Sequence, residues 1–367
     1  MNREEIYERL ATIDDPMLGD DIVSLGVVTD VDVTPETIRV GVVLHAPHAP
    51  DERAIADSIR EELSGFDRDV ELYLDGTTER RGGPLPGVKN VIAVSSGKGG
   101  VGKTTVSVNV AAALADRGAR VGLLDADIYG PNVPRMLGGD EGPTLSDDET
   151  LIPPQRNGVK VLSLAHLIPD GEAAVLRGPM VDDILQRLLT ETGWAPLDYL
   201  VVDLPPGTGD AQLTLCQTVE VTGVVIVTTP QGVATDDVAR NLSMFGNQDI
   251  PVLGIVENMR TFECPGCGDR HDLFGSGGGE AIAREYDLPF LGALPIDPEV
   301  RTDGDDGTPV VFDDTETARA FATVAENAAD AVGVLRRREA ADASSIGVRV
   351  TGNGPEANAV GDPEANG

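Results

Sequence analysis

The chain has 367 residues, 41% of them hydrophobic, which is enough for a large globular domain and a smaller one. Its 62 acidic residues against 28 basic ones give a formal net charge of -34. Only four residues are lysines: Lys89, Lys98, Lys103 and Lys160. A chain this acidic argues against nucleic acid as a general partner, because neutralising phosphates needs basic patches. Its charge is typical of a halophile, whose concentrated cytosolic salt screens the repulsion.

Segments that direct a protein to a membrane or out of the cell are not found in the sequence. No run of about 18 apolar residues is present, and the charged residues 1–10 lack the apolar centre of a secretory signal. Three cysteines are too few for a disulfide framework in a chain of this length. We therefore expect a cytoplasmic protein without a membrane partner.

Residues 1–79 are predicted to form a small α+β domain. Apolar side chains recur at helical spacing at Ile6, Leu10 and Ile13 and again over 55–63, whereas residues 38–44 alternate as a strand does. A segment rich in Gly and Pro follows, and we predict that residues 80–87 are an interdomain linker.

From residue 88 the pattern changes to apolar runs separated by helical stretches. Strands are predicted at 91–95, 121–125, 159–164, 199–203, 224–228, 252–256 and 290–294. Nearly continuous apolar runs are typical of parallel strands covered on both faces. We therefore predict a doubly wound α/β domain with a mostly parallel sheet over residues 88–338. Residues 339–367 have few large apolar groups and are predicted to be a disordered acidic tail.

Residues 97–104 match the phosphate-binding pattern G-x-x-x-x-G-K-[ST], between a predicted strand and a predicted helix. Glycines let the backbone amides curl around phosphates, and the helix N-terminus adds partial positive charge. Lys103 is expected to reach the β- and γ-phosphates, and the Thr104 hydroxyl to bind Mg²⁺. The predicted nucleotide-binding residues of this loop are Gly97, Lys98, Gly99, Gly100, Val101, Gly102, Lys103, Thr104 and Thr105.

A lysine directly after the first glycine of the loop resembles the signature of the deviant Walker ATPases, the class of MinD and ParA. This resemblance implies that Lys98 acts with Lys103 in catalysis, reaching across a nucleotide-sandwiched homodimer where an arginine finger would otherwise sit. A solvated lysine is the alternative. Asn258 follows a predicted strand at the position where this class places an adenine-contacting asparagine, which implies ATP as the nucleotide. A turn residue is the alternative there.

Two carboxylate motifs follow buried strands. Residues 124–132 resemble switch I of the same class, which implies that Asp127 orients the attacking water. Residues 201–210 resemble Walker B and switch II, which implies that Asp203 holds Mg²⁺ and that the Gly207 amide senses the γ-phosphate. The alternative for both aspartates is that they only cap the next helix.

Cys264 and Cys267 form a C-x-x-C turn, which is half of a four-ligand metal site. The chain has no second such pair, so a symmetric dimer is needed to complete the site. Zinc is the alternative metal, with His271 as a third ligand from the same chain. Cys216 lies in a predicted apolar helix and is expected to be a small core residue.

These motifs, together with residues 256–259, 262–268, 274–279, 291–297 and 306–309, resemble the Mrp/ApbC-type iron–sulfur carrier ATPases over residues 88–335. The resemblance implies a homodimer in which the two Cys264/Cys267 pairs bridge one [4Fe–4S] cluster, delivered to apo iron–sulfur proteins in an ATP-dependent way. The alternative is a MinD/ParA-like partitioning or regulatory ATPase whose cysteine pair binds structural zinc. Taken with the charge, a halophilic archaeon is the inferred source.

The N-terminal domain resembles the small iron–sulfur assembly domain often fused ahead of this ATPase, on the strength of residues 15–17 and 21–28. Where that family often has a cysteine before the second helix, this chain has His45 and His48. A thiol-based role for this domain is therefore not implied. Two histidines in a proline-rich loop are predicted to face solvent, with metal binding as the alternative.

Overall fold

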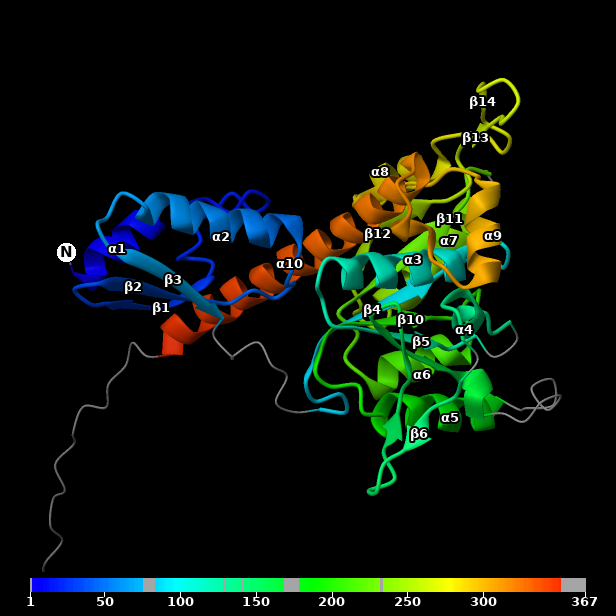
Figure 1. Cartoon of the computed structure of the whole chain (residues 1–367), viewed down its shortest axis with the longest axis horizontal. Helices are drawn as coiled ribbons and strands as arrows, with labels where there is room; N and C mark the ends of the chain where they lie inside the picture. The colour runs from blue at the N-terminus through cyan, green and yellow to red at the C-terminus, as the bar shows by residue number, and fades with distance from the viewer. Residues whose placement is uncertain are drawn as a thin grey trace, which may run out of the picture.

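The computed structural model describes residues 2–74, 83–127, 130–139, 141–167, 178–231 and 234–350. A small N-terminal domain lies beside a larger sheet domain, and the long helix α10, Glu316–Val350, extends from the larger domain to the smaller one (Figure 1). None of the helices within these residues is both long and apolar enough to cross a membrane.

The N-terminal domain is a three-stranded sheet covered by two helices. Its elements are α1 (Arg3–Leu10), β1 (Val28–Val33), β2 (Thr37–Val42), α2 (Pro50–Leu63) and β3 (Asp69–Leu74). The strand order is β1-β2-β3, with the first pair antiparallel and the second parallel. Ile6 and Leu10 of α1 pack with Ile55 and Ile59 of α2 against the sheet, as their helical spacing predicts. The predicted small α+β domain is confirmed, although β1 was not predicted.

The larger domain contains an eight-stranded sheet in the order β15-β12-β11-β4-β10-β5-β9-β8. Its strands are β4 (Val88–Ser95), β5 (Val121–Asp125), β8 (Gln155–Arg156), β9 (Val159–Ser163), β10 (Leu197–Asp203), β11 (Gly223–Thr228), β12 (Val252–Glu257) and β15 (Phe290–Ala293). The seven predicted strands are confirmed within three residues at each end. Only β8, a short antiparallel edge strand, was not predicted.

Helices cover both faces of this sheet, as predicted for a doubly wound domain. In β4, Ile92 and Val94 pack on the side of α3 (Lys103–Asp116) and α10, whereas Val91 and Ala93 pack on the opposite side. That opposite side is covered by α5 (Gly178–Thr190), α6 (Asp210–Thr218), α7 (Ala234–Gly246) and α8 (Gly278–Glu285). The remaining short elements are α4 (Val133–Met136), β6 (Thr144–Leu145), β7 (Leu151–Ile152), β13 (Phe262–Glu263), β14 (Arg270–His271) and α9 (Pro298–Asp306).

Helix α10 corrects the predicted start of the tail. It continues through Val350, so the expected domain end at Arg338 falls inside a helix. Beyond Arg338 the helix runs beside the N-terminal domain, where Ala341 packs against that domain's core. A segment with few large apolar groups gives no sign of such partners when it is read alone. The rest of the predicted tail, 351–367, and linker residues 80–82 lie outside the described residues.

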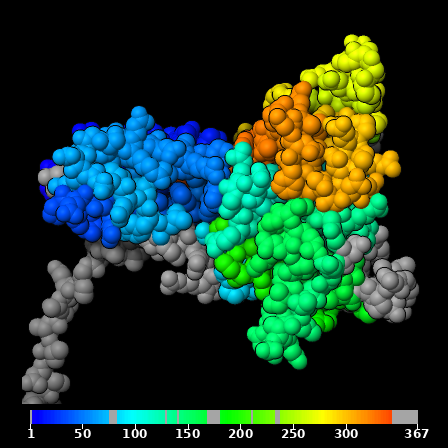
Figure 2. All heavy atoms as spheres, viewed as in Figure 1, coloured from blue at the N-terminus to red at the C-terminus, as the bar shows by residue number. Residues whose placement is uncertain are grey.

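The N-terminal domain contacts the larger domain at the amino ends of the sheet strands, and the phosphate-binding loop lies at the opposite, carboxyl ends. The surfaces of the two domains are in contact (Figure 2). Asn90, early in β4, donates to the carbonyl of His45 at 2.7 Å, and the hydroxyl of Tyr199, early in β10, donates to the carbonyl of Pro47 at 3.1 Å. Residues at the amino ends of parallel strands therefore hold the N-terminal domain.

A buried guanidinium strengthens this contact. Arg337 of α10 is 1% exposed and pairs with three carboxylates of the N-terminal domain: Asp15 at 2.6 Å, Glu52 at 3.2 Å, and Asp51. The pair partners lie 285 or more residues apart in the chain.

The prediction that His45 and His48 face solvent is wrong, because both lie at the interface between the domains. Burial, followed by the charges of Arg336, Arg337 and Lys89, lowers the pKa of His45 to about 4. His48 lies against Gly118 of the larger domain, with its Cε1 3.3 Å from where a Cβ at that glycine would stand. Neither belongs to a group of three or more potential metal ligands among the described residues.

Candidate functional site

The loop between β4 and α3 has the backbone that a phosphate-binding loop requires. Gly100 and Gly102 have φ of +81° and +83°, a left-handed conformation that favours glycine. Gly97 is needed for a different reason, since a Cβ there would lie 2.4 Å from the Cβ of Asp237 on α7. The predicted loop is confirmed in its position between a buried strand and a helix N-terminus.

Asp203, at the carboxyl end of β10, gathers the side chains of the loop and its helix. The Nζ atom of Lys103 lies 2.7 Å from its Oδ1, and the hydroxyl groups of Thr104 and Ser107 donate to it at 2.7 and 2.6 Å. Asp203 itself is fully buried. Carboxylate and hydroxyl oxygens are the protein ligands that Mg²⁺ prefers, so Thr104 and Asp203 fit the ion predicted for them.

Asp125, at the end of β5, is a residue that sequence reasoning missed. Burial first, and the nearby charge of Asp203 second, raise its pKa to about 7. Its carboxylate accepts from the backbone N–H groups of Asp127 at 3.1 Å and Val133 at 3.3 Å, and from the Ser163 hydroxyl at 3.2 Å. The position of Asp125 in the sequence could have indicated its role. It is the last residue of β5, and β5 pairs with β10 so that Asp125 lies directly beside Asp203.

Hydrogen bonds from the backbone of the switch I segment to Asp125 hold Asp127 beside the buried carboxylates. The side chain of Asp127 lies close to Gly130, with Oδ2 3.9 Å from where a Cβ of that glycine would stand. Residues 128–129 of the predicted switch lie outside the described residues.

Two other predicted residues lie at the rim of this centre. Lys98 is partly exposed, and its Nζ lies 3.8 Å from Oδ2 of Asp237 on α7. The backbone N–H of Gly207 donates to the carbonyl of Ser96 at 2.8 Å. A phosphate contact by the Gly207 amide therefore requires this hydrogen bond to break.

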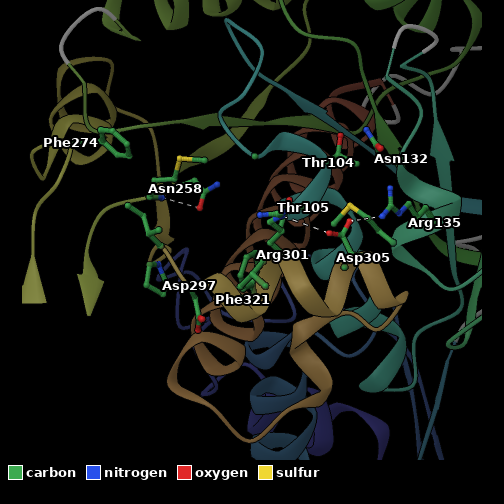
Figure 3. A pocket seen from close by; sticks show the side chains of 17 residues that line it. Thr104, Thr105, Asn132, Arg135, Asn258, Phe274, Asp297, Arg301, Asp305 and Phe321 are labelled. Carbon is green, nitrogen blue, oxygen red and sulfur yellow. Dashed lines mark hydrogen bonds and ion pairs between the residues drawn. The ribbon is translucent and has the colours of Figure 1, made fainter. Parts of the chain in front are cut away.

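A cavity of about 370 Å³ opens beside the loop and has the size of a small-ligand site (Figure 3). It is lined by Thr104 and Thr105 on one side and by Asn258 and Phe274 on the other. The side chain of Asn258 donates to the carbonyl of Val101 at 2.8 Å and accepts from its neighbour's N–H at 2.9 Å. Its amide is thus held in one orientation and retains one N–H and one lone pair for a ligand.

The predicted cysteine pair lies on a β-hairpin formed by β13 and β14, which projects from the molecule (Figure 1). Cys264 is half-buried and Cys267 exposed. Hydrogen bonds from the backbone N–H groups of Gly266 and Cys267 lower the pKa of the Cys264 thiol. Cys216, by contrast, is partly buried and packs against a hydrophobic core rather than within it, and burial raises the pKa of its thiol to about 11.

The hairpin and the cavity share a wall. Phe262 of β13 bridges to Ile296, whose N–H donates to the carbonyl of Thr261 at 2.7 Å, and Ile296 lines the cavity. On the other side of the hairpin, Phe274 lies three residues after His271, the last residue of β14, and also lines the cavity. The segments on both sides of the thiol-bearing turn therefore reach this wall.

The matches to known families agree with the motifs described above. Residues 87–329 match the family described as NUBPL iron-transfer P-loop NTPase. The chain belongs to this family. Residues 3–72 match a second family, described as iron-sulfur cluster assembly protein. The NUBPL family assignment and the N-terminal match confirm the resemblances inferred from the sequence, and the predicted P-loop ATPase class is confirmed with them.

Individual relatives agree with this membership. The iron-sulfur cluster carrier protein of Deinococcus radiodurans is 45% identical over 337 residues, which is 90% of this chain and 96% of that protein. The carrier protein of the same name from Escherichia coli K12 is 49% identical over 249 residues, 68% of this chain and 67% of that protein. These relatives do not support the halophilic archaeal source inferred from the charge.

Solved structures bear out the fold. A nucleotide-binding protein from Archaeoglobus fulgidus in complex with ADP, with cobalt found in it, has a TM-score of 0.55 and 40% identity, covering 62% of this chain and 89% of that one. The septum site-determining protein MinD of Pyrococcus horikoshii, complexed with Mg-ADP, has a TM-score of 0.52 at 22% identity, covering 67% of this chain and 98% of that one. The second likeness concerns the fold alone.

Proposed function

We propose that this NUBPL-family NTPase is a cytoplasmic carrier of iron–sulfur clusters that works as a homodimer and uses ATP. The observation that carries the proposal is the exposed hairpin of Cys264 and Cys267, which is anchored on the wall of the nucleotide cavity. The relatives named as iron-sulfur cluster carrier proteins support the choice of cargo.

The number of available thiols supports a dimer. The chain has three cysteines, and Cys216 packs beside a core. A [4Fe–4S] cluster takes four thiolate ligands. Cys264 and Cys267 supply two of them, so two chains that meet at their hairpins are needed to hold one cluster between them.

ATP is proposed to bind with its phosphates in the loop of residues 97–104 and its base in the cavity beside Asn258. Lys103 then exchanges its contact with Asp203 for the β- and γ-phosphates, leaving Asp203 and Thr104 to hold Mg²⁺. When bound, the ion neutralises phosphate charge. The Gly207 amide gives up its bond to Ser96 and turns to the γ-phosphate.

Hydrolysis is proposed to need the second subunit. Lys98 is partly exposed and lies 3.8 Å from Asp237, which supports a role for its side chain at a neighbouring active site. There it supplies positive charge to the phosphates, and Asp127 orients the water that attacks. Closing the dimer around ATP brings the two hairpins together, and opening it after hydrolysis separates them.

The proposed recipients are apo iron–sulfur proteins, with neither nucleic acid nor a membrane as a partner. The net charge of -34 supports the exclusion of nucleic acid. A partitioning or regulatory ATPase with zinc at the hairpin is the second candidate. The grouping of Cys267, Asp269 and His271 favours a metal ion there. A partitioning role, however, does not explain why the thiols lie on a hairpin that shares a wall with the nucleotide cavity.

Anaerobic reconstitution with iron and sulfide tests the carrier role. We expect one cluster per dimer, seen as a sulfide-containing chromophore and a doubled mass in light scattering, followed by transfer that activates an apo [4Fe–4S] enzyme. Cys264→Ala and Cys267→Ala should take up none, whereas Cys216→Ala should match the unaltered protein. A chain that takes up only zinc and never acquires the chromophore would overturn the proposal.

A further inference from the structure

The cysteine hairpin carries two further metal-ligating side chains. The sulfur of Cys267, a carboxylate oxygen of Asp269 and a ring nitrogen of His271 all lie within 4.8 Å of one another. The thiol of Cys267 donates to Oδ2 of Asp269 at 3.3 Å. Ligand atoms bound at about 2.0–2.3 Å to one tetrahedral ion lie up to about 4 Å apart. The distances between these three ligand atoms therefore have to shorten only slightly for the atoms to bind one ion.

Strand geometry explains why these side chains converge. Side chains alternate between the two faces of a strand, so Asp269 and His271 share one face and Arg270 points to the other. Arg270 forms ion pairs there with Glu263 at 3.2 Å and with Glu316 of α10 at 2.7 Å. One face of the hairpin thus ties it to the molecule, and the opposite face holds the ligand group.

The turn between the strands places a second cysteine, Cys264, close to this group. The N–H of Cys264 donates to the carbonyl of Asp269 at 2.9 Å, and the N–H of Gly268 donates back to the carbonyl of Cys264 at 2.8 Å. Gly268 has a φ of +74°, which favours glycine at this tight corner. The closed turn holds Cys264 near Cys267, although its sulfur lies outside the group of three ligand atoms, so binding one ion with them requires a movement of the Cys264 side chain.

We infer that a single chain binds one divalent transition-metal ion at the hairpin tip, through Cys264, Cys267, Asp269 and His271. Two thiolates and an imidazole select Fe²⁺, Co²⁺ or Zn²⁺ over Mg²⁺ and Ca²⁺, which prefer oxygen ligands. The group is exposed, so the ion can exchange with solvent.

This inference rests on the proposed function only through the shared thiols. A bridged cluster takes two thiolates from each of two chains and makes no use of Asp269 or His271. A single ion uses all four side chains of one chain and needs no second subunit. The two cargoes therefore exclude each other, and excess divalent metal should compete with cluster assembly. His271 separates the two states, because only the single ion uses it.

Titration of the full reduced chain with Co²⁺ under anaerobic conditions tests the site. We expect one Co²⁺ per chain, with the absorption of a tetrahedral ion bearing thiolate ligands, and with the protein still monomeric in light scattering. His271→Ala should weaken Co²⁺ binding by more than roughly 100-fold, exceeding the loss seen when an outer partner of a ligand is removed. Asp269→Ala should weaken it less but in the same direction. Asp272→Ala, an exposed neighbour outside the group, is the matched control and should bind as the unaltered chain does.

The same variants separate this inference from the carrier role. His271→Ala should still assemble the bridged cluster from iron and sulfide, with an unchanged yield per dimer. Unchanged Co²⁺ affinity in His271→Ala would overturn the single-chain site, as would half an equivalent of Co²⁺ per chain with dimer formation. If the carrier role fails instead, the chromophore is lost in the unaltered protein while Co²⁺ binding and its dependence on His271 persist.

Discussion

At the scale of single residues, Asp203 holds together the side chains at the phosphate-binding loop. Three donors from the P-loop and α3 converge on its fully buried carboxylate: Lys103, Thr104 and Ser107. An unpaired charge in such a place is costly, so Lys103, the proposed phosphate ligand, also stabilises the fold while it contacts Asp203. A substitution of Lys103 is therefore expected to change both catalysis and stability.

Lys103→Ala should abolish ATP hydrolysis and also lower the free energy of unfolding by about 3–5 kcal/mol, because it leaves Asp203 buried without its counter-charge. Chemical denaturation and phosphate release measure the two effects. Adding Asp203→Asn removes the uncompensated charge, so the double variant should regain much of the stability and none of the hydrolysis. Equal stability of Lys103→Ala and the unaltered chain would show that the pair does not stabilise the fold.

At the scale of elements, the cysteine hairpin and the nucleotide cavity are built on the same segments. β13 follows the strand that ends beside Asn258, and β14 leads within three residues to Phe274, which lines the cavity. A base that packs against Phe274 constrains the chain that carries the thiols. Any such coupling is reciprocal, because nucleotide and cluster then shift each other's affinity by the same factor.

Phe274→Ala should weaken this link without unfolding the protein, since the side chain is 41% exposed. In the unaltered chain we expect nucleotide to change the alkylation rate of Cys264 and Cys267 by about fivefold or more. The change should shrink towards none in Phe274→Ala. Leu273→Ala is the control, because this neighbour is 57% exposed and does not line the cavity. Equal losses in both variants would exclude a specific role for the phenylalanine.

The sequence predicts elements best where one local pattern dominates. All seven major strands were found because each is a nearly continuous apolar run, and the P-loop was found because its glycines and lysines are contiguous. β8 was not predicted because a strand of two residues at a sheet edge is too short to show an apolar pattern. Asp125 escaped because its importance comes from the neighbouring strand. The ion pairs of Arg337 escaped because their partners are 285 or more residues away.

At the scale of the whole molecule, the buried cluster around Arg337 between the domains contains more acids than bases. Asp15, Asp51 and Glu52 surround the single guanidinium of Arg337, and Asp330 accepts from the N–H of Asp51 at 3.0 Å. Burial first raises the pKa of Glu52, to about 7, and burial with the neighbouring Asp51 raises that of Asp330 to the same region. Glu52 and Asp330 therefore keep protons in the folded chain that the unfolded chain releases near pH 4.

A carboxyl whose pKa is higher in the folded state contributes stability that is lost as pH rises through the folded value. We expect the unfolding free energy to fall between about pH 5 and pH 8, and Glu52→Gln to flatten this slope. Denaturant titrations across this range measure it. Glu62→Gln, on the same helix but paired at the surface with Arg9, is the control and should keep the slope. A slope unchanged by Glu52→Gln would contradict the assignment.

The net charge of -34 acts on the entire chain. Repulsion among surface carboxylates reaches about 10 Å at 0.1 M salt and about 3 Å at 1 M. We expect the thermal unfolding midpoint to rise steadily as KCl is raised over this range. Sucrose, which does not screen charge, is the control for non-specific stabilisation. A midpoint that is flat or falls with KCl would show that repulsion among the surface carboxylates does not limit the stability of the chain.

Helix α10 also limits how cargo can be handed over. It contacts the cysteine hairpin at Glu316 and the N-terminal domain at Arg337, and a rise of about 1.5 Å per residue separates these points by roughly 30 Å. An acceptor seated on the N-terminal domain must therefore reach at least this far to touch the thiols of the same subunit. In the proposed carrier, a small acceptor that takes the cluster from one hairpin therefore does not touch the N-terminal domain of the same subunit.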